Sequence, residues 1–233
     1  MSLPDSEELI IEVDGSTHVP GLLQRASAAR AMLVLAHGAG AGMRHAFLAE
    51  MAFGLAQRGI DTLRYEFPYM SRGSRRPDAP PLCHATVRAA VEAARRIAPT
   101  FPIFAGGKSF GGRMTSQAQA VEPLRGVHGL AFLGFPLHPP RAPSDERARH
   151  LFDVRIPMLF LQGTRDELAD QTLLSRLIEK LGTRAVLELF PEADHSFHAP
   201  ARSGHTDRGN IARISELIAT WIETAILDGK ASS

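Results

Sequence analysis

The chain has 233 residues, of which 44% are hydrophobic, and its 26 basic and 25 acidic side chains leave a net charge of +1. This balance argues against nucleic-acid binding, which usually shows a basic excess, and the single cysteine argues against a disulfide framework and favours a reducing compartment. The N-terminal MSLPDSEELIIEV lacks the pattern of a secretory signal, and no apolar run approaches the ~20 residues that cross a bilayer, so we expect one cytoplasmic domain over residues 1–233 and no membrane span.

Short apolar runs alternate with helical patterns along the chain. This alternation predicts an α/β fold: a three-layer α/β/α sandwich in which helices cover a mainly parallel sheet of about eight strands, with no large cap domain. In chain order, strands are expected at 8–13, 17–26, 31–38, 60–68, 101–109, 129–136, 156–163 and 184–191. Apolar stripes at helical spacing predict helices near 47–55, 87–97, 110–120, 173–181 and 211–225, with one short helix in the connection 137–155.

The stretch AGGKSFGG, residues 105–112, matches two different motifs. A phosphate-binding loop needs a glycine five positions before the Gly-Lys-Ser, because several glycines let backbone N–H groups wrap the phosphates. That position is Pro102, which removes a donor and stiffens the chain. The alternative is Gly-x-Ser-x-Gly at a sharp turn between a strand and a helix, which exposes Ser109 as a nucleophile.

A serine nucleophile needs a histidine base and an acid that orients the base. Asp166 follows a predicted buried strand directly, and His195 lies just past the last predicted strand. The order Ser109, Asp166, His195 is the one expected when the serine lies on such a strand–turn–helix elbow. Asp170 is an alternative acid and His198 an alternative base. Asp194, His195 and His198 could also suggest a metal site, but no second His/Asp/Cys cluster at metal-ligand spacing and no H-E-x-x-H motif occur, so we expect no metal. The triad chemistry needs no cofactor.

The developing oxyanion needs backbone N–H donors. HGAGAG, residues 37–42, follows the first expected parallel strand, and its small residues allow a backbone N–H to face the site. We assign the Ala39 and Phe110 amides as the two donors of an oxyanion hole. His37 is expected to be a structural hydrogen-bonding group in this loop.

Five segments carry a resemblance to a known family: HGAGAGMRH, PYMSRG, GGKSFGGRMTS, QGTRDEL and ADHSF. Together they resemble the α/β-hydrolase superfamily, in its compact dienelactone-hydrolase-like branch, which also contains testis-expressed and chromatin-complex proteins of animals. The resemblance implies a Ser-His-Asp core at Ser109, His195 and Asp166. Dienelactone hydrolases place cysteine at the elbow, whereas this chain has serine there and its only cysteine, Cys83, elsewhere. The animal members show that the fold can also serve as part of an assembly.

For other polar residues the sequence makes less specific predictions. Lys108 precedes the nucleophile and should point away from Ser109, which favours a structural or gatekeeping role. Cys83 is expected to be a packed thiol. Residues 69–82 are expected to form a loop on the active-site side. This loop contains three arginines, Arg72, Arg75 and Arg76. They either bind an anionic substrate or are solvated, and the second interpretation is favoured. Arg44 and His45, near the glycine loop, have the same two interpretations.

The sequence therefore predicts a serine hydrolase that cleaves small-molecule esters or thioesters. The alternative is a noncatalytic protein-interaction module on a hydrolase scaffold, with a nucleotide-binding protein as a more distant possibility. The absence of a large cap suggests an open site that suits short or flexible acyl groups.

Overall fold

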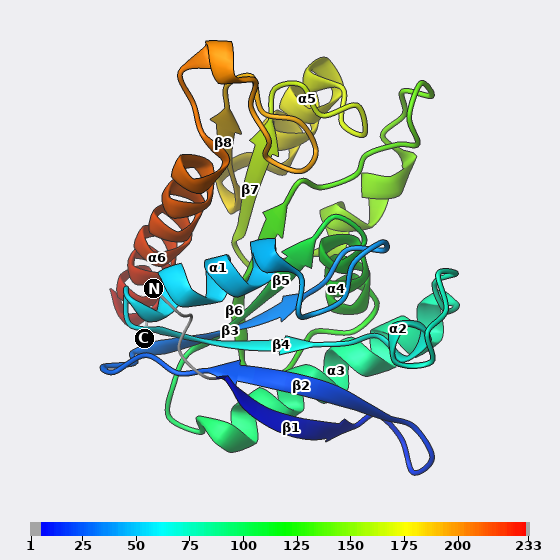
Figure 1. The fold of residues 1–233 in the computed structure, drawn as a ribbon, viewed down its shortest axis with the longest axis vertical. Coiled ribbons are helices and arrows are strands. Elements are labelled where there is room, and N and C mark those ends of the chain that lie inside the picture. The colour runs from blue at the N-terminus through cyan, green and yellow to red at the C-terminus, as the bar shows by residue number, and fades with distance from the viewer. Residues whose placement is uncertain (1–5, 232–233) are drawn as a thin grey trace.

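The computed structural model describes residues 6–231, and these contain one eight-stranded sheet (Figure 1). Its strand order is β1-β2-β4-β3-β5-β6-β7-β8. Strands β3 to β8 run parallel, whereas β1 pairs antiparallel with β2, and β2 antiparallel with β4. The strand bounds are β1 Glu7–Glu12, β2 His18–Gln24, β3 Ala31–Ala36, β4 Ile60–Tyr65, β5 Ile103–Lys108, β6 Val127–Leu133, β7 Met158–Gly163 and β8 Ala185–Phe190.

Helices cover both faces of this sheet. One face is covered by α1 and α6, which pack against each other, and the other by α3, α4 and α5 (Figure 1). The predicted three-layer α/β/α class is confirmed, and the described residues include no large cap. The α-helices are α1 Ala46–Ala56, α2 Pro68–Ser71, α3 Pro80–Ile97, α4 Phe110–Val121, α5 Gln171–Leu181 and α6 Asp207–Ala231; the 3₁₀ turns are η1 Glu146–Asp153, η2 Gly182–Arg184 and η3 Ala201–Ser203.

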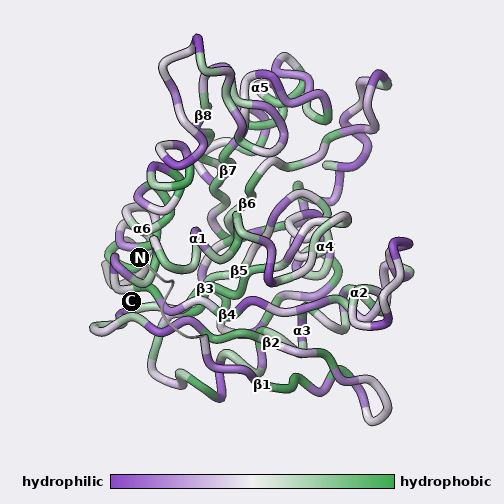
Figure 2. Tube along the Cα trace, viewed as in Figure 1, coloured by the Kyte–Doolittle hydropathy of each residue, from purple (hydrophilic) through white to green (hydrophobic). Residues whose placement is uncertain are grey.

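The buried strands serve two cores because side chains alternate between the faces of a sheet. In β3, Met32 and Val34 pack with α3 and α4, whereas Leu33 and Leu35 pack with α1 and α6. All six residues of β3 are buried, as expected of a parallel strand covered on both sides. In Figure 2 hydrophobic colour follows the central strands, and the loop after α2 is largely hydrophilic. Within residues 6–231 no helix combines the length and the apolar character that a bilayer crossing requires.

The prediction that residues 69–82 form a loop throughout is wrong. The segment begins inside α2, and its last residues, from Pro80, form the first turn of α3. Both helices have proline in their first turn, where the missing N–H costs no intrahelical bond and the fixed φ suits the helix. Proline is also common in loops, which is why the sequence pattern predicts a loop here. In the connection 137–155, the short helix expected there is η1.

The tight pairing of β5 with β6 gives a test of the fold. A Cβ atom added at Gly106 would lie 1.9 Å from the backbone oxygen of Ala131, so Gly106→Ala forces the two strands apart. We expect it to lower the free energy of unfolding by about 3 kcal/mol, measured by urea denaturation. Gly15→Ala is the control, because nothing lies within 4 Å of a Cβ there. Equal stability of the two variants would contradict this packing.

Candidate active site

Ser109 occupies a strained turn between β5 and α4. Its backbone has φ 50° and ψ −115°, a conformation that side-chain-bearing residues rarely adopt and that costs on the order of 1–3 kcal/mol. The turn is possible because two glycines let neighbouring backbone come close. An added Cβ would lie 2.6 Å from the Ala36 oxygen at Gly107 and 2.4 Å from the His37 oxygen at Gly111. The Gly-x-Ser-x-Gly motif therefore forms the sharp strand–turn–helix that its sequence predicted.

A hydrogen-bonded chain links Ser109 to two residues that follow later strands. His195 Nε2 lies 2.8 Å from Ser109 Oγ, and His195 Nδ1 lies 2.7 Å from Asp166 Oδ2. An ionised carboxylate only accepts hydrogen bonds, so Nδ1–H donates to Asp166 and Nε2 is free to accept the serine hydroxyl proton. This is the tautomer that a histidine general base needs.

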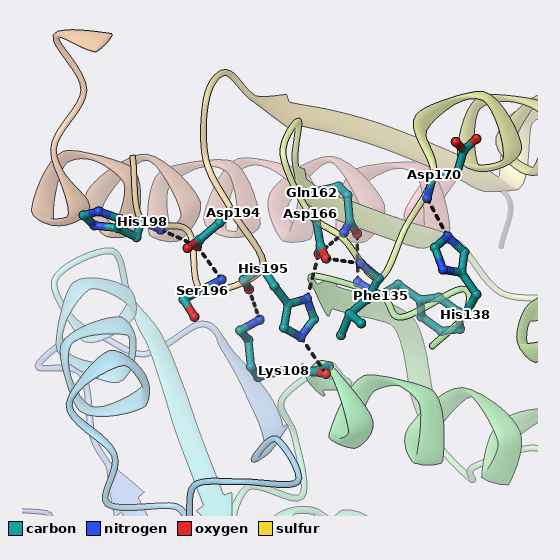
Figure 3. Close-up of polar contacts among 12 residues, drawn as sticks. Lys108, Phe135, His138, Gln162, Asp166, Asp170, Asp194, His195, Ser196 and His198 are labelled. Atoms are coloured by element: carbon teal, nitrogen blue, oxygen red, sulfur yellow. Dashed lines mark hydrogen bonds and ion pairs between the residues drawn. The ribbon is translucent and has the colours of Figure 1, made fainter. Parts of the chain in front are cut away.

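The carboxylate of Asp166 is buried and its oxygens have further donors. Its side chain is 0% exposed. Gln162 Nε2 donates to Oδ2 at 2.5 Å, and the Leu168 N–H donates to Oδ1 at 2.8 Å. Gln162 is held in turn, because its Oε1 accepts the Phe135 N–H at 2.8 Å (Figure 3). Several donors thus hold the Asp166 carboxylate in one position, so it can fix the orientation of His195.

Gln162 was missed by the sequence analysis, although a signal was present. It is a fully buried amide near the end of the otherwise apolar strand β7, MLFLQG. A buried amide must find partners for its polar atoms, which here are Phe135 and Asp166. A polar residue shortly before a strand-end acid could have been read as a contact to that acid.

The glycine loop after β3 lies beside Ser109. A Cβ on Gly38 would lie 3.9 Å from the Ser109 Cβ. Tyr69, fully buried, donates its hydroxyl to the Ala39 carbonyl at 3.1 Å and packs against the Phe110 ring. Among the described residues, no protein acceptor pairs with the Ala39 or Phe110 N–H. Both N–H groups are therefore without a protein acceptor in the described part of the chain.

His37 organises this loop from a buried position. Its Nδ1 donates to the Gly38 carbonyl at 2.7 Å, and its Nε2 accepts the Phe67 N–H at 3.0 Å. Burial lowers the pKa of His37 to about 4, against the smaller raising effect of the Gly38 bond. The imidazole is therefore neutral near pH 7, and it acts as a bridge between the glycine loop and the segment after β4.

The alternative acid and base lie elsewhere. Asp170 is the N-cap of α5 and accepts the Leu173 N–H at 2.9 Å, while its own N–H donates to His138 (Figure 3). His198 is exposed and its Nδ1 lies 2.9 Å from Asp207 Oδ1. Asp194 accepts the backbone N–H groups of Ser196 and His198, which shapes the turn that carries His195.

The remaining polar candidates are at the surface or packed. Arg72 pairs with Asp78 at 2.5 Å, Arg44 pairs with Glu8 at 2.7 Å, and both guanidiniums are largely exposed. Cys83 is buried, and burial raises the pKa of its thiol to about 12. His45 caps α1 by accepting the Phe47 N–H. Two further arginines of the α2–α3 loop are exposed: Arg75 and Arg76.

Comparison with known proteins agrees with this fold. A family model described as an alpha/beta hydrolase domain matches residues 29–223, so the chain belongs to the α/β-hydrolase superfamily. The chain is thus a hydrolase by family. This match also includes all the strands from β3 to β8 and the residues that the structure gathers around Ser109.

Solved structures show the same fold at low sequence identity. A dienelactone hydrolase from Anabaena variabilis is 20% identical, with 96% of this chain and 99% of that chain covered and a TM-score of 0.75. Est1E from Butyrivibrio proteoclasticus, with ferulic acid bound, is 15% identical, with coverages of 94% and 99% and a TM-score of 0.74. An α/β serine hydrolase without lid from Xanthomonas campestris is 20% identical, with coverages of 93% and 96% and a TM-score of 0.70. The dienelactone-hydrolase-like form expected from the motifs is confirmed at the level of the fold.

The buried neutral His37 predicts a loss of stability in acid. The unfolded chain binds a proton at this histidine below about pH 6.5, but the folded protein does so only near pH 4. His37 therefore does not reduce the free energy of unfolding above pH 6.5, and it reduces this free energy by about 3 kcal/mol as the pH falls to 4. Urea denaturation of wild type and His37→Gln across this range should show a weaker pH dependence in the variant. Parallel curves would contradict the burial of an uncharged His37.

Proposed function

We propose that this protein is a serine hydrolase that cleaves carboxylic esters or thioesters through an acyl-enzyme intermediate. The observation that carries the proposal is the hydrogen-bonded chain of Ser109, His195 and Asp166. It starts at a strained elbow and joins the ends of three parallel strands. A buried acid, a histidine with the required tautomer and an activated serine together support acyl transfer.

In the first half-reaction Ser109 Oγ attacks the acyl carbon while His195 Nε2 takes the hydroxyl proton. Asp166 stabilises the imidazolium that forms. The Ala39 and Phe110 amides donate to the oxyanion of the tetrahedral intermediate, and each donor contributes about 3 kcal/mol by analogy with other acyl-transfer enzymes. The intermediate collapses, the bond to the leaving group breaks, and His195 returns its proton to the departing alcohol or thiol.

In the second half-reaction water takes the place of the alcohol. His195 removes a proton from the water as its oxygen attacks the acyl carbon, and the same two amides stabilise the oxyanion. Collapse releases the carboxylic acid, and His195 gives the proton to Ser109 Oγ. Every step uses protein groups and water alone.

Solved structures with the same fold favour a small ester substrate. The related fold of Est1E is known with ferulic acid bound, and the Xanthomonas protein is a serine hydrolase without lid. An uncapped, open site favours short or flexible acyl groups.

Ser109→Ala should abolish ester hydrolysis without unfolding the protein. We expect at least about a 10³-fold loss of kcat on p-nitrophenyl esters of short acyl chains, because the nucleophile is gone. A fluorophosphonate should add once to the wild type, at Ser109, as peptide mass spectrometry can show. Full activity of the variant, or labelling at another serine, would reject the assignment. A wild type that is inert on esters and thioesters, and that captures a stable protein partner, would favour the noncatalytic interaction module.

Asp166→Asn and Asp170→Asn form a matched pair that tests the acid. The amide introduced by Asp166→Asn cannot hold the required histidine tautomer as a carboxylate does, so kcat should fall about 10³- to 10⁴-fold. Asparagine is as good an N-cap as aspartate, so Asp170→Asn should stay within about twofold of wild type. Steady-state kinetics on p-nitrophenyl acetate separates the two. A larger loss in Asp170→Asn would transfer the acid's role to that residue.

A further inference from the structure

Lys108, the residue directly before the nucleophile, reaches the loop that carries His195. Its ammonium nitrogen Nζ donates a hydrogen bond to the backbone carbonyl of His195 (Figure 3). Within residues 6–231 no hydrogen bond joins this side chain to the serine hydroxyl, whose partner is His195 Nε2. The last residue of β5 is thereby tied to the loop 191–200 after β8, which we call the histidine loop.

The ammonium group is enclosed from several sides. Nζ lies 5.3 Å from the centre of the Phe197 ring. Phe197 is itself buried and has a positive φ of 65°. On the β6 side, a Cβ added at Gly134 would lie 2.9 Å from Nζ and 3.4 Å from the His195 ring. On the β3 side, Gly38 approaches the lysine stem. A carbonyl, an aromatic face and two glycines thus form a fitted space for one cation.

The charged groups that the structure describes near Lys108 do not form an ion pair with its ammonium. Asp166, after β7, and Asp194, in the histidine loop, are the charged groups that act on the ammonium, and both raise its pKa. Burial is the larger effect and lowers the pKa of Lys108 to about 8. Within residues 6–231 no ion pair within 4 Å joins Nζ to a carboxylate. The charge is therefore directed at the carbonyl of His195, in a charge-assisted hydrogen bond.

We propose that Lys108 is a positioning residue: its ammonium holds the histidine loop against β5, so that the His195 imidazole stays in line with Ser109 and Asp166. The inference rests on the proposed function, because it assigns Lys108 a part in the same reaction. The imidazole is fixed at Nδ1 by Asp166, and Lys108 fixes the backbone from which it extends. Misplacement of a catalytic group by about 1 Å can cost on the order of 10²-fold in rate.

The experiment compares wild type, Lys108→Met, Lys108→Arg and the exposed-lysine control Lys180→Met. The kinetic constants kcat and KM for p-nitrophenyl acetate are measured across the pH range that spans the lysine pKa, and kcat is normalised to the sites that a fluorophosphonate titrates. Lys108→Met should lower the normalised kcat about 10- to 100-fold and change KM less than about twofold. Lys108→Arg keeps a cationic donor and should recover kcat to within about fivefold of wild type. Lys180→Met should match wild type.

The pH profile separates positioning from packing. Loss of the ammonium proton weakens the bond to the His195 carbonyl, so wild-type kcat should decline as the pH rises through about 8. This decline should be absent from Lys108→Met, which has no proton to lose, and from Lys108→Arg, whose guanidinium stays charged.

Three results would overturn the proposal: an unchanged normalised kcat in Lys108→Met, an increase confined to KM, or the same alkaline decline in both Lys108 variants. If Lys108→Met does not fold, Lys108→Gln replaces it. If neither neutral variant folds, the test depends on Lys108→Arg. A folded Lys108→Arg with less than a hundredth of wild-type kcat overturns the proposal, whereas a kcat within fivefold of wild type supports it. A wild type without activity or labelling at Ser109 rejects the proposed function itself, and the role of Lys108 with it. An active wild type with an indifferent Lys108→Met rejects the role of Lys108 alone.

Discussion

The close backbone approach at the β5–α4 turn is the constraint on which the site depends. Ser109 is held at a positive φ because β3 and β5 pair tightly on one side and α4 begins immediately on the other. No side chain fits at Gly107 or Gly111 without displacing backbone. The strain places the serine hydroxyl above the sheet edge, within reach of a base, and leaves the Phe110 N–H at the start of the helix without an acceptor among the described residues.

A second layer of contacts keeps this arrangement rigid. Gln162 joins the Phe135 backbone to Asp166, His37 joins the glycine loop to Phe67, and Tyr69 fixes the Ala39 carbonyl. Each is buried, so an unmade bond would leave a polar group without water. The groups that would take part in the chemistry are thus bonded to buried polar groups beneath them, and the backbone of His195 also accepts a hydrogen bond from Lys108.

Much of the fold was predictable because its signals are local. Apolar runs such as those of β3 and β7 need cover on both faces, and only a sheet between helix layers provides it. The α2–α3 segment was mispredicted because proline is common both in loops and in the first turn of helices. The contact of Gln162 with Phe135 could not be predicted, because Phe135 is distant in sequence and becomes adjacent only after β6 and β7 pair.

The sequence by itself determined the order of the elements, the glycines of the elbow and the three strand ends at which Ser109, Asp166 and His195 lie, since periodicity and motif spacing are properties of neighbouring residues. Only the tertiary structure decided which acid faces which base, because Asp166 and Asp170 differ by four positions and a helix cap takes the second. The same holds for Lys108, whose partner lies 87 residues away. Contacts of that kind arise when separate strands meet at one edge of the sheet, and no local pattern records them.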